Sequence, residues 1–250
     1  MSLSDQDLTR FARHIVLKEI GGAGQARLRA AQVVVIGAGG IGSPALQYLV
    51  AAGIGRIGIV DDDAVDLSNL QRQTLFGTGD IGTPKTDAAA TALAHIDPGV
   101  RIERRTARID PDNVREIIAG ADVVLDGTDN FATRLAVADA ALALCIPLVS
   151  AAVAQFEGQL GVYRGWEPDK PCYRCFVGGD PEREGASCAD VGVLGAMAGV
   201  MGSLAALEVT RAIVPFGEDS AGKLLLADGL SLRFRTIALP KDPSCRCAAA

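Results

Sequence analysis

Aromatic side chains, histidine and excess positive charge are all scarce in this 250-residue chain. Phe, Trp and Tyr make up 4% of the residues, and there are two histidines. Lys and Arg number 24 against 30 Asp and Glu, which gives a formal net charge of −6. Because binding to nucleic-acid phosphates needs clustered cations, we expect no nucleic-acid partner.

Long apolar runs and a secretory signal are also missing from the sequence. Gly or polar residues interrupt each apolar stretch before the roughly 20 residues that a membrane helix needs, so no membrane partner is expected. The first seven residues contain neither a basic nor an apolar signal region. We therefore expect a cytoplasmic protein, whose six cysteines favour metal binding or thiol chemistry over disulfides.

What the chain does contain is a regular alternation of β-branched runs and helical segments. Strands are predicted over residues 32–36, 56–61, 100–109, 122–126 and 147–151. Helices are predicted over residues 5–28 with a break at Gly21-Gly22, and over residues 45–52, 84–96, 112–119 and 130–145. This order predicts a doubly wound, mostly parallel α/β sheet of the Rossmann-like type.

The pattern changes after about residue 155. Residues 159–164 alternate like an antiparallel strand, and a Cys- and Gly-rich loop then runs to Gly192. A helix is predicted over residues 193–213 and a hairpin over residues 223–239, with its turn at Asp228-Gly229. The sequence therefore predicts an antiparallel C-terminal extension to the parallel sheet.

A glycine motif between a predicted strand and a predicted helix indicates a nucleotide site. Its glycines are Gly37, Gly39 and Gly42, and Asp61 follows at the end of the next strand. Such glycines allow close approach to phosphate at a helix N-terminus, and an acid at this place accepts hydrogen bonds from ribose. The motif alone does not distinguish NAD from ATP, and a glycine turn that serves only packing is the alternative.

Charged residues downstream favour a reaction at phosphate. Arg72 and Lys85 bring two cations towards the glycine loop, whereas an intact dinucleotide needs no such pair. Asp129 follows another strand at the same expected sheet edge, where a carboxylate can hold Mg²⁺. Displacement of pyrophosphate at an α-phosphate fits this set of charges.

These blocks together resemble the MoeB/ThiF/HesA family, the bacterial relatives of ubiquitin-activating enzymes, and the MoeB branch most closely. The resemblance covers nearly the whole chain, in order. The matching blocks are Arg10-Phe11-Ala12-Arg13-His14-Ile15, Gly37-Ala38-Gly39-Gly40-Ile41-Gly42, Asp61, Ser68-Asn69-Leu70-Gln71-Arg72, Pro84-Lys85, Asp126-Gly127-Thr128-Asp129-Asn130, Pro171-Cys172-Tyr173-Arg174-Cys175 and Gly199-Val200-Met201-Gly202-Ser203.

The resemblance implies ATP-dependent adenylation of a ubiquitin-like sulfur carrier at its Gly-Gly tail, with release of pyrophosphate. It implies one domain over residues 1–250, made of N-terminal helices (1–30), a nucleotide-binding core (31–155) and a carrier- and zinc-binding part (156–250). Arg13 is implied to act in the site of the neighbouring subunit of a homodimer, and Asp129 to take Mg²⁺. The residues implied to hold ATP are Gly37, Gly39, Gly40, Gly42, Asp61, Ser68, Asn69, Leu70, Gln71, Arg72, Lys85, Asp129 and Asn130.

The cysteines divide into three groups. Cys172 and Cys175 have zinc-ligand spacing, and we expect Cys245 and Cys247 to complete a structural zinc site, although the family's second pair is separated by two residues. A degraded or three-cysteine site is the alternative. Cys188 matches a family loop cysteine that is either a sulfur-transfer thiol or has no essential role. Cys145 is expected in the core because its neighbours are apolar.

Three functional hypotheses remain after this comparison. The first is adenylation of a MoaD-type carrier for molybdenum-cofactor biosynthesis, with a ThiS-type carrier of thiamine biosynthesis as its variant. The second is an NAD-dependent oxidoreductase, for which the few His and Tyr residues offer no catalytic set. The third is a non-catalytic scaffold that binds carriers, against which the charged residues around the expected phosphate site argue.

Overall fold

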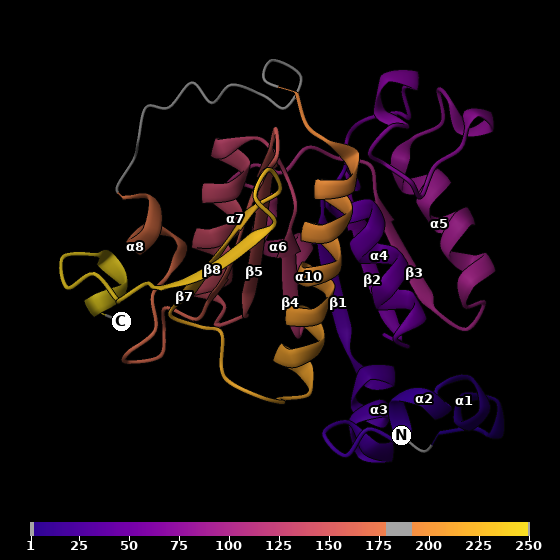
Figure 1. The fold of residues 1–250 in the computed structure, drawn as a ribbon, viewed down its shortest axis with the longest axis horizontal. Helices are drawn as coiled ribbons and strands as arrows, with labels where there is room; N and C mark the ends of the chain where they lie inside the picture. Colours follow the sequence, from indigo (N-terminus) through magenta and orange to yellow (C-terminus); the bar gives the residue numbers. More distant parts are fainter. Residues whose placement is uncertain (1–2, 179–191, 250) are drawn as a thin grey trace.

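The computed structural model describes residues 3–178 and 192–249. Its described part contains one eight-stranded sheet in the order β3-β2-β1-β4-β5-β6-β7-β8 (Figure 1). Five parallel strands are followed by an antiparallel region, as the sequence predicts. The parallel strands are β1 (Gln32–Ile36), β2 (Arg56–Val60), β3 (Arg101–Arg105), β4 (Val123–Asp126) and β5 (Leu148–Ala154).

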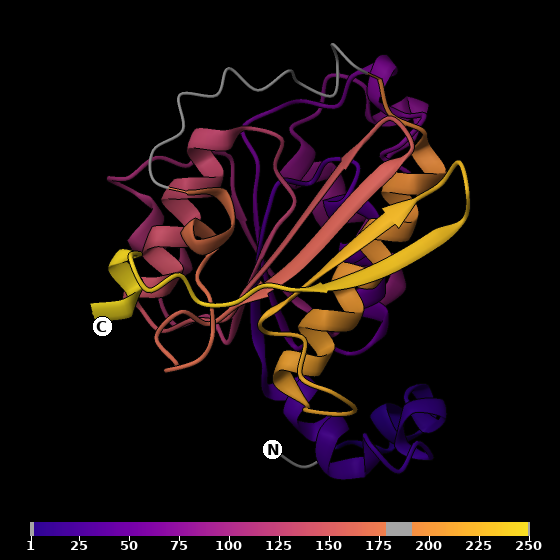
Figure 2. The same ribbon diagram turned by 60° about the vertical axis from the view of Figure 1, so that its left-hand side comes forward.

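Burial on both faces explains the continuous apolar strands at the centre of the sheet. In β1, Val33 and Val35 face one apolar cluster, whereas Val34 and Ile36 face another. Helices α4 (Gly42–Ala51), α5 (Lys85–Ile96) and α10 (Gly195–Ile213) cover the first face, and α6 (Val114–Ile118), α7 (Phe131–Ala143) and α8 (Tyr173–Val177) cover the second. Figure 2 shows the sheet between α10 and α7. The predicted doubly wound fold is confirmed.

The antiparallel extension consists of β6 (Glu157–Tyr163), β7 (Lys223–Asp228) and β8 (Arg233–Ala238). A tight turn at Gln155 and Phe156 joins β5 to β6, and Gln155 has the positive φ of 51° that such a turn requires. The edge strand β8 is exposed along its whole length. The predicted hairpin is therefore present, with its turn beginning at Gly229.

α10 is long and apolar enough, by length and composition alone, to cross a membrane, contrary to our expectation that every apolar run is interrupted too early. Helices at the centre of globular proteins meet the same criteria. In α10, Met197, Met201 and Val209 are buried, and the helix lies against α4, β4, β5 and β6. This packing accounts for its composition.

Three short helices precede the sheet, namely α1 (Asp5–Arg10), α2 (Ala12–Ile15) and α3 (Gly21–Ala30). The prediction that Gly21-Gly22 breaks a helix is wrong, because Gly21, with a φ of +59°, begins α3. The chain instead turns over residues 16–20. α3 leads directly into β1, so these helices lie at the edge of the sheet where the parallel strands begin (Figure 1).

Candidate functional site

A cleft of about 450 Å³ lies at the carboxyl ends of the parallel strands. Loops that follow β1, β2 and β4, and the end of β5, line it. This is the edge at which open α/β sheets bind ligands. Of the residues predicted to hold ATP, the cleft is lined by Gly37, Gly39, Gly40, Asp61, Asn69, Arg72, Lys85, Asp129 and Asn130.

The glycine loop between β1 and α4 forms one wall of the cleft, and sterics dictate its composition. Gly37 has a φ of +87°, which L side chains rarely adopt. A Cβ at Gly42 would lie 1.9 Å from the carbonyl oxygen of Gly37. The absence of a side chain at Gly42 therefore permits the loop to close tightly in front of the first turn of α4. Gly42 itself does not line the cleft. That turn offers backbone N–H groups and the positive end of the helix dipole.

Asp61 is fixed beside the glycine loop by backbone hydrogen bonds. Its carboxylate accepts hydrogen bonds from the backbone N–H of Ala38 at 2.7 Å and of Asp63 at 2.9 Å. Burial raises the pKa of Asp61, while the charge of Lys85 and these hydrogen bonds oppose the rise. The acid therefore has a fixed orientation next to the loop.

Two cations enter the cleft from separate segments. Lys85, the first residue of α5, is only 4% exposed and its Nζ lies 2.7 Å from Asp63 Oδ2 and 4.0 Å from Asp61 Oδ1. Arg72 passes over Gly40 and donates a 3.2 Å hydrogen bond to the carbonyl oxygen of Ser68. Both cations are therefore held in the cleft by groups of this chain.

The side chains in the segment before Arg72 mainly stabilise a short turn of the backbone. The short 3₁₀ helix η1 (Leu67–Asn69) is capped by Asp66, which accepts hydrogen bonds from the backbone N–H and hydroxyl of Ser68. Ser68, Leu70 and Gln71, which we predicted to hold ATP, are not among the residues that line the cleft. A second 3₁₀ helix, η2 (Thr78–Asp80), lies between this segment and α5.

The end of β4 and the loop after it contain two acids in opposite environments. Asp126 is 1% exposed and accepts hydrogen bonds from the backbone N–H and hydroxyl of Thr128 and from the Ser150 hydroxyl. Asp129 is exposed and lines the cleft. Asn130 also borders the cleft, but its side chain caps α7 by accepting a hydrogen bond from the backbone N–H of Thr133 at 3.0 Å. Asp129 is thus the acid of this loop that is available to a ligand.

Among the cleft-lining residues that sequence reasoning missed are Gln73 and Arg134, which are 3% and 7% exposed. Gln73 follows directly after Arg72, so the block Ser68–Arg72 ended one residue too early. Arg134 lies on α7 and contacts backbone oxygens from two other segments. No sequence motif reports such contacts.

The four predicted cysteine ligands come together on the other side of the sheet from α10. Cys172 Sγ lies 3.8 Å from Cys175 Sγ and 3.5 Å from Cys245 Sγ, and Cys175 Sγ lies 3.4 Å from Cys247 Sγ. All four sulfurs lie within 4.8 Å of one another. Four thiolates about 2.3 Å from one tetrahedral ion are separated by about 3.8 Å, so this donor set fits zinc.

The one-residue spacing of Cys245 and Cys247 is compatible with this cluster because the chain curls there. The short 3₁₀ helix η3 (Arg246–Ala249) begins between the two cysteines and turns Cys247 back towards the others. We call Cys172, Cys175, Cys245 and Cys247 the cysteine cluster.

The remaining cysteines lie elsewhere. The expectation that Cys145 is buried is wrong: with a φ of 53° it follows the C-terminal end of α7 and is exposed. Its apolar neighbours misled the prediction, because the left-handed conformation turns the side chain outwards. Cys188 lies outside the described residues.

Comparison with known proteins agrees with this arrangement. Residues 11–247 match the ThiF family. The chain belongs to the ThiF family. It is 43% identical to the sulfur carrier protein adenylyltransferase of Thermus thermophilus, over 98% of this chain and 92% of that protein. It is 38% identical to the molybdopterin-synthase adenylyltransferase of Salmonella typhimurium, over 97% of each chain.

The fold of this ThiF-family chain is also that of a solved structure. The crystal structure of E. coli MccB with AMPCPP and MccA superposes with a TM-score of 0.83, at 22% identity, over 100% of this chain and 75% of that one.

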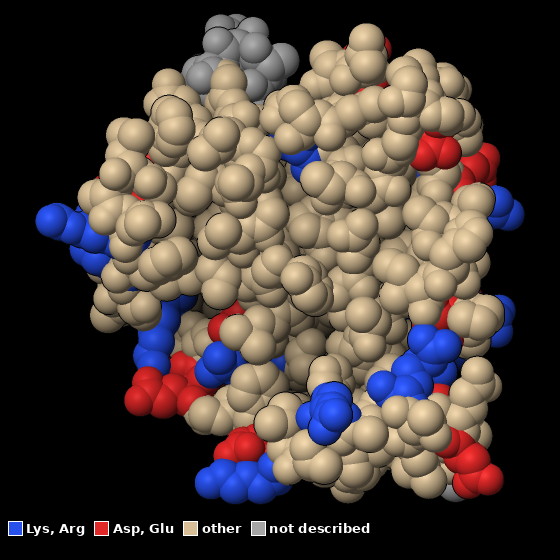
Figure 3. Space-filling view, turned by 45° about the vertical axis from the view of Figure 1, so that its right-hand side comes forward, with Lys and Arg blue, Asp and Glu red and all other residues tan. Residues whose placement is uncertain are grey.

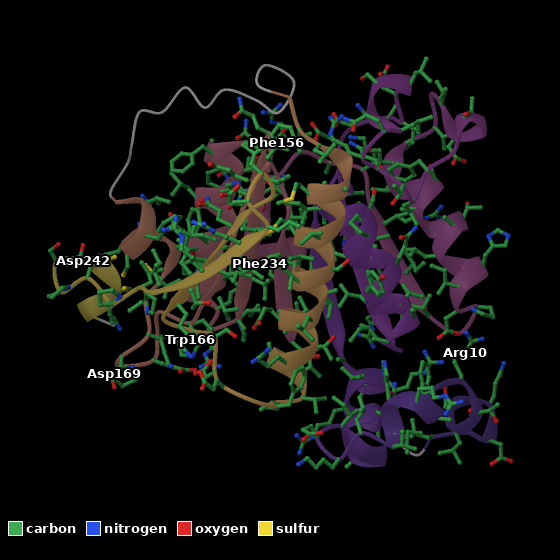
Figure 4. All side chains as sticks on the ribbon, viewed as in Figure 1. Arg10, Phe156, Trp166, Asp169, Phe234 and Asp242 are labelled. Carbon is green, nitrogen blue, oxygen red and sulfur yellow. The ribbon has the colours of Figure 1, made fainter. Side chains whose placement is uncertain are left out.

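One predicted catalytic residue of this ThiF-family chain lies away from the cleft. Arg13 is exposed on α2 and does not line the cleft. Figure 4 shows the two ends of the molecule, with Arg10 at the end of α1 and Phe156 in the β5–β6 turn. Within one chain the structure therefore does not bring Arg13 to the other site residues.

Proposed function

We propose that this protein uses ATP to adenylate the C-terminal carboxylate of a ubiquitin-like sulfur-carrier protein of the MoaD type, for molybdenum-cofactor biosynthesis. The observation that carries the proposal is the meeting of the glycine loop, Arg72, Lys85 and Asp129 in one cleft. Relatives matched along nearly their whole length are named as adenylyltransferases of this kind.

The proposed reaction needs positioning rather than proton transfer. The carrier's terminal carboxylate is already an anion, and one of its oxygens attacks the α-phosphorus of ATP. The bond between that phosphorus and the oxygen bridging to the β-phosphate breaks, and its electron pair leaves with pyrophosphate. Negative charge grows on the leaving group, and the cations of Arg72 and Lys85 stabilise it there. The product is an acyl adenylate, and no general base is required.

Further roles are assigned by position. The N–H groups at the start of α4 face phosphate, and Asp61 is oriented for ribose hydroxyls. Asp129 would hold Mg²⁺, which screens the phosphate charges during pyrophosphate release. The cysteine cluster would hold a structural Zn²⁺ that joins two distant parts of the chain.

We also infer a homodimer in which Arg13 enters the site of the neighbouring subunit. Support comes from the exposed position of Arg13 and from an apolar surface on α4 and α10, where Tyr48, Val200 and Leu207 are exposed. Figure 3 shows that the centre of the face on this side of the molecule bears few charged side chains.

We place the protein in the cytoplasm, where reducing conditions keep the cysteine thiols available for metal. For Cys188, which lies outside the described residues, both alternatives remain, a thiol for sulfur transfer and a thiol without an essential role.

The decisive experiment is ATP–pyrophosphate exchange with a MoaD-type and a ThiS-type carrier in parallel. Exchange that depends on the MoaD-type carrier is the expected result, and a carrier lacking its last glycine serves as the control. Exchange with only the ThiS-type carrier would move the protein to thiamine biosynthesis. Exchange with neither carrier, in a folded protein that binds ATP, would overturn the proposed reaction.

A further inference from the structure

The residues placed between the cysteines of the cluster all contact α7. Tyr173 and Arg174 lie between Cys172 and Cys175, and Arg246 lies between Cys245 and Cys247. Arg174 donates two hydrogen bonds of 2.8 Å to the carboxylate of Asp139 on α7, and Arg246 forms an ion pair with the same carboxylate. The cluster is therefore fastened to the helix that follows the Asp129 loop.

Tyr173 makes the second connection, closer to the cleft. Its ring is 5% exposed and packs edge-on against Tyr163 at 5.3 Å between ring centroids. Its phenol lies beside the Arg134 guanidinium. Burial lowers the pKa of Arg134, but the charge of Asp126 and this phenol together raise it above its ordinary value. Because a guanidinium has donors only, the phenol oxygen is the acceptor in this contact.

Arg134 in turn ties the Asp129 loop to the neighbouring strand. One of its terminal nitrogens donates to the backbone oxygens of Thr128 and of Ala151, the latter at 2.8 Å. The other donates to the Ser150 hydroxyl at 3.0 Å and lies 3.7 Å from Asp126. Thr128 immediately precedes Asp129, so the guanidinium holds the backbone next to that acid.

These contacts form a continuous path from the cysteine cluster to the cleft. We propose that Tyr173 and Arg134 are a positioning pair through which the metal-bound cysteine cluster holds residues 127–130 in place. The part of the proposal that concerns Asp129 and Mg²⁺ rests on the function proposed above. The mechanical link between cluster and loop stands independently of it.

Hydrogen exchange at the loop measures this link without any substrate. The backbone N–H groups of Gly127 and Thr128 are bonded to Ile36 O and Asp126 Oδ1, both at 3.0 Å, and therefore report on loop opening. Tyr173→Phe removes the phenol oxygen but keeps the ring packing. We expect it to retain its zinc and to speed exchange at these two N–H groups about fivefold, the effect of losing one hydrogen bond of ordinary strength. Peptides from β2 should exchange as in the wild-type protein.

Asp139→Asn is the matched control, because it weakens the contacts of Arg174 and Arg246 with α7 but leaves Tyr173 and the bonds from Arg134 to the loop in place. Its loop exchange should remain at the wild-type level. Removing zinc with a chelator should speed loop exchange in the wild-type protein and in Asp139→Asn, but add nothing further in Tyr173→Phe. If chelation unfolds the protein globally, the comparison of the zinc-loaded variants decides.

Loop exchange at the wild-type level in zinc-loaded Tyr173→Phe would overturn the proposal, as would an undiminished chelator effect in that variant.

The Mg²⁺ concentration for half-maximal pyrophosphate exchange should rise about fivefold in Tyr173→Phe, with little change at saturating Mg²⁺. A loosened loop with an unchanged Mg²⁺ requirement would refute the positioning of Asp129. Failure of the wild-type protein in the carrier assay would overturn the proposed function only, because loop exchange is measured without carrier.

Discussion

Two aspartates three residues apart show how the backbone assigns different tasks to one side-chain type. Asp126 is buried at the end of β4, and its oxygens are occupied by Thr128 and Ser150. Asp129 lies beyond the turn, exposed in the cleft. Replacing the first therefore removes a hydrogen-bond acceptor of the sheet's edge, whereas replacing the second removes the acid proposed to hold Mg²⁺.

Asp129→Ala should reduce carrier-dependent pyrophosphate exchange at least about 100-fold, because Mg²⁺ loses its protein carboxylate. The melting temperature and carrier binding should stay close to those of the wild-type protein. Asp112→Ala, which removes an exposed acid before α6, should leave exchange unchanged. Wild-type turnover in Asp129→Ala would contradict the magnesium assignment.

Residues with a chemical motif could be predicted from the sequence, and residues defined by their contacts could not. Arg72 and Asp129 are predicted because each follows a strand, and Lys85 because it opens the next helix; the structure brings all three to the cleft. Arg134 was missed because its partners are backbone oxygens 6 and 17 residues away. The contacts of Tyr173 could not be predicted either, because in the sequence it is only a position within the Pro171–Cys175 motif.

Local sequence also predicted the elements with regular periodicity better than the short ones. The β-branched runs of β1 and β4 mark buried strands, and both ends of each strand agree closely with the prediction. α8, with five residues, was predicted as loop because one helical turn has no measurable period. The break in the N-terminal helical region is predicted at Gly21-Gly22, whereas Gly21 begins α3 and the chain turns over residues 16–20.

α1 is short, so its end groups contribute much of its stability. Ser4 and Asp7 form a capping box, and Arg29 on α3 lies 2.9 Å from the Asp7 carboxylate. The hydrogen bond from Ser4 lowers the pKa of Asp7, burial partly opposes this effect, and Arg29 lowers the pKa further. The ionised form of Asp7 therefore holds α1 onto α3.

Asp7→Asn should destabilise the protein by about 1 kcal/mol near neutral pH, because it removes a charged cap. The pKa of Asp7 is lower in the folded than in the unfolded protein, so its contribution is present above the ordinary value of 3.8. This contribution is lost as the pH falls through the folded pKa. Urea unfolding of both proteins at several pH values should show their stabilities converging below pH 3.8. A difference that does not depend on pH would contradict the role of the charge, and Asp5→Asn in the same turn is the control.

At the scale of the whole molecule, the chain places its proposed functional residues at opposite edges of the sheet. The cleft lies at the carboxyl edge, and Arg13 lies with the N-terminal helices at the amino edge. A twofold arrangement of two chains can join these edges, which one chain cannot do. The resemblance predicted Arg13 as a catalytic residue, and only a second chain makes that prediction compatible with the geometry.

Mixing two inactive variants tests this arrangement. Arg13→Ala and Asp129→Ala should each be inactive alone, whereas their co-expressed mixture should regain roughly a quarter of wild-type exchange, because half the dimers are mixed and each mixed dimer has one intact site. Each variant expressed with itself is the control. No recovery in a mixture that demonstrably contains mixed dimers would place Arg13 in its own chain's site, or in none.

The cysteine cluster also has a consequence for the unfolded chain. Its two pairs are more than 70 residues apart in sequence, and α10, β7 and β8 lie between them. A metal held by all four thiolates would therefore close a loop of that length, and a chain-entropy treatment borrowed from disulfides gives a contribution of about 4 kcal/mol for such a closure. The metal would thus limit how far the C-terminal third can unravel while the parallel strands are intact. A chain that meets its metal late in folding would search a much larger set of conformations than one that meets it early.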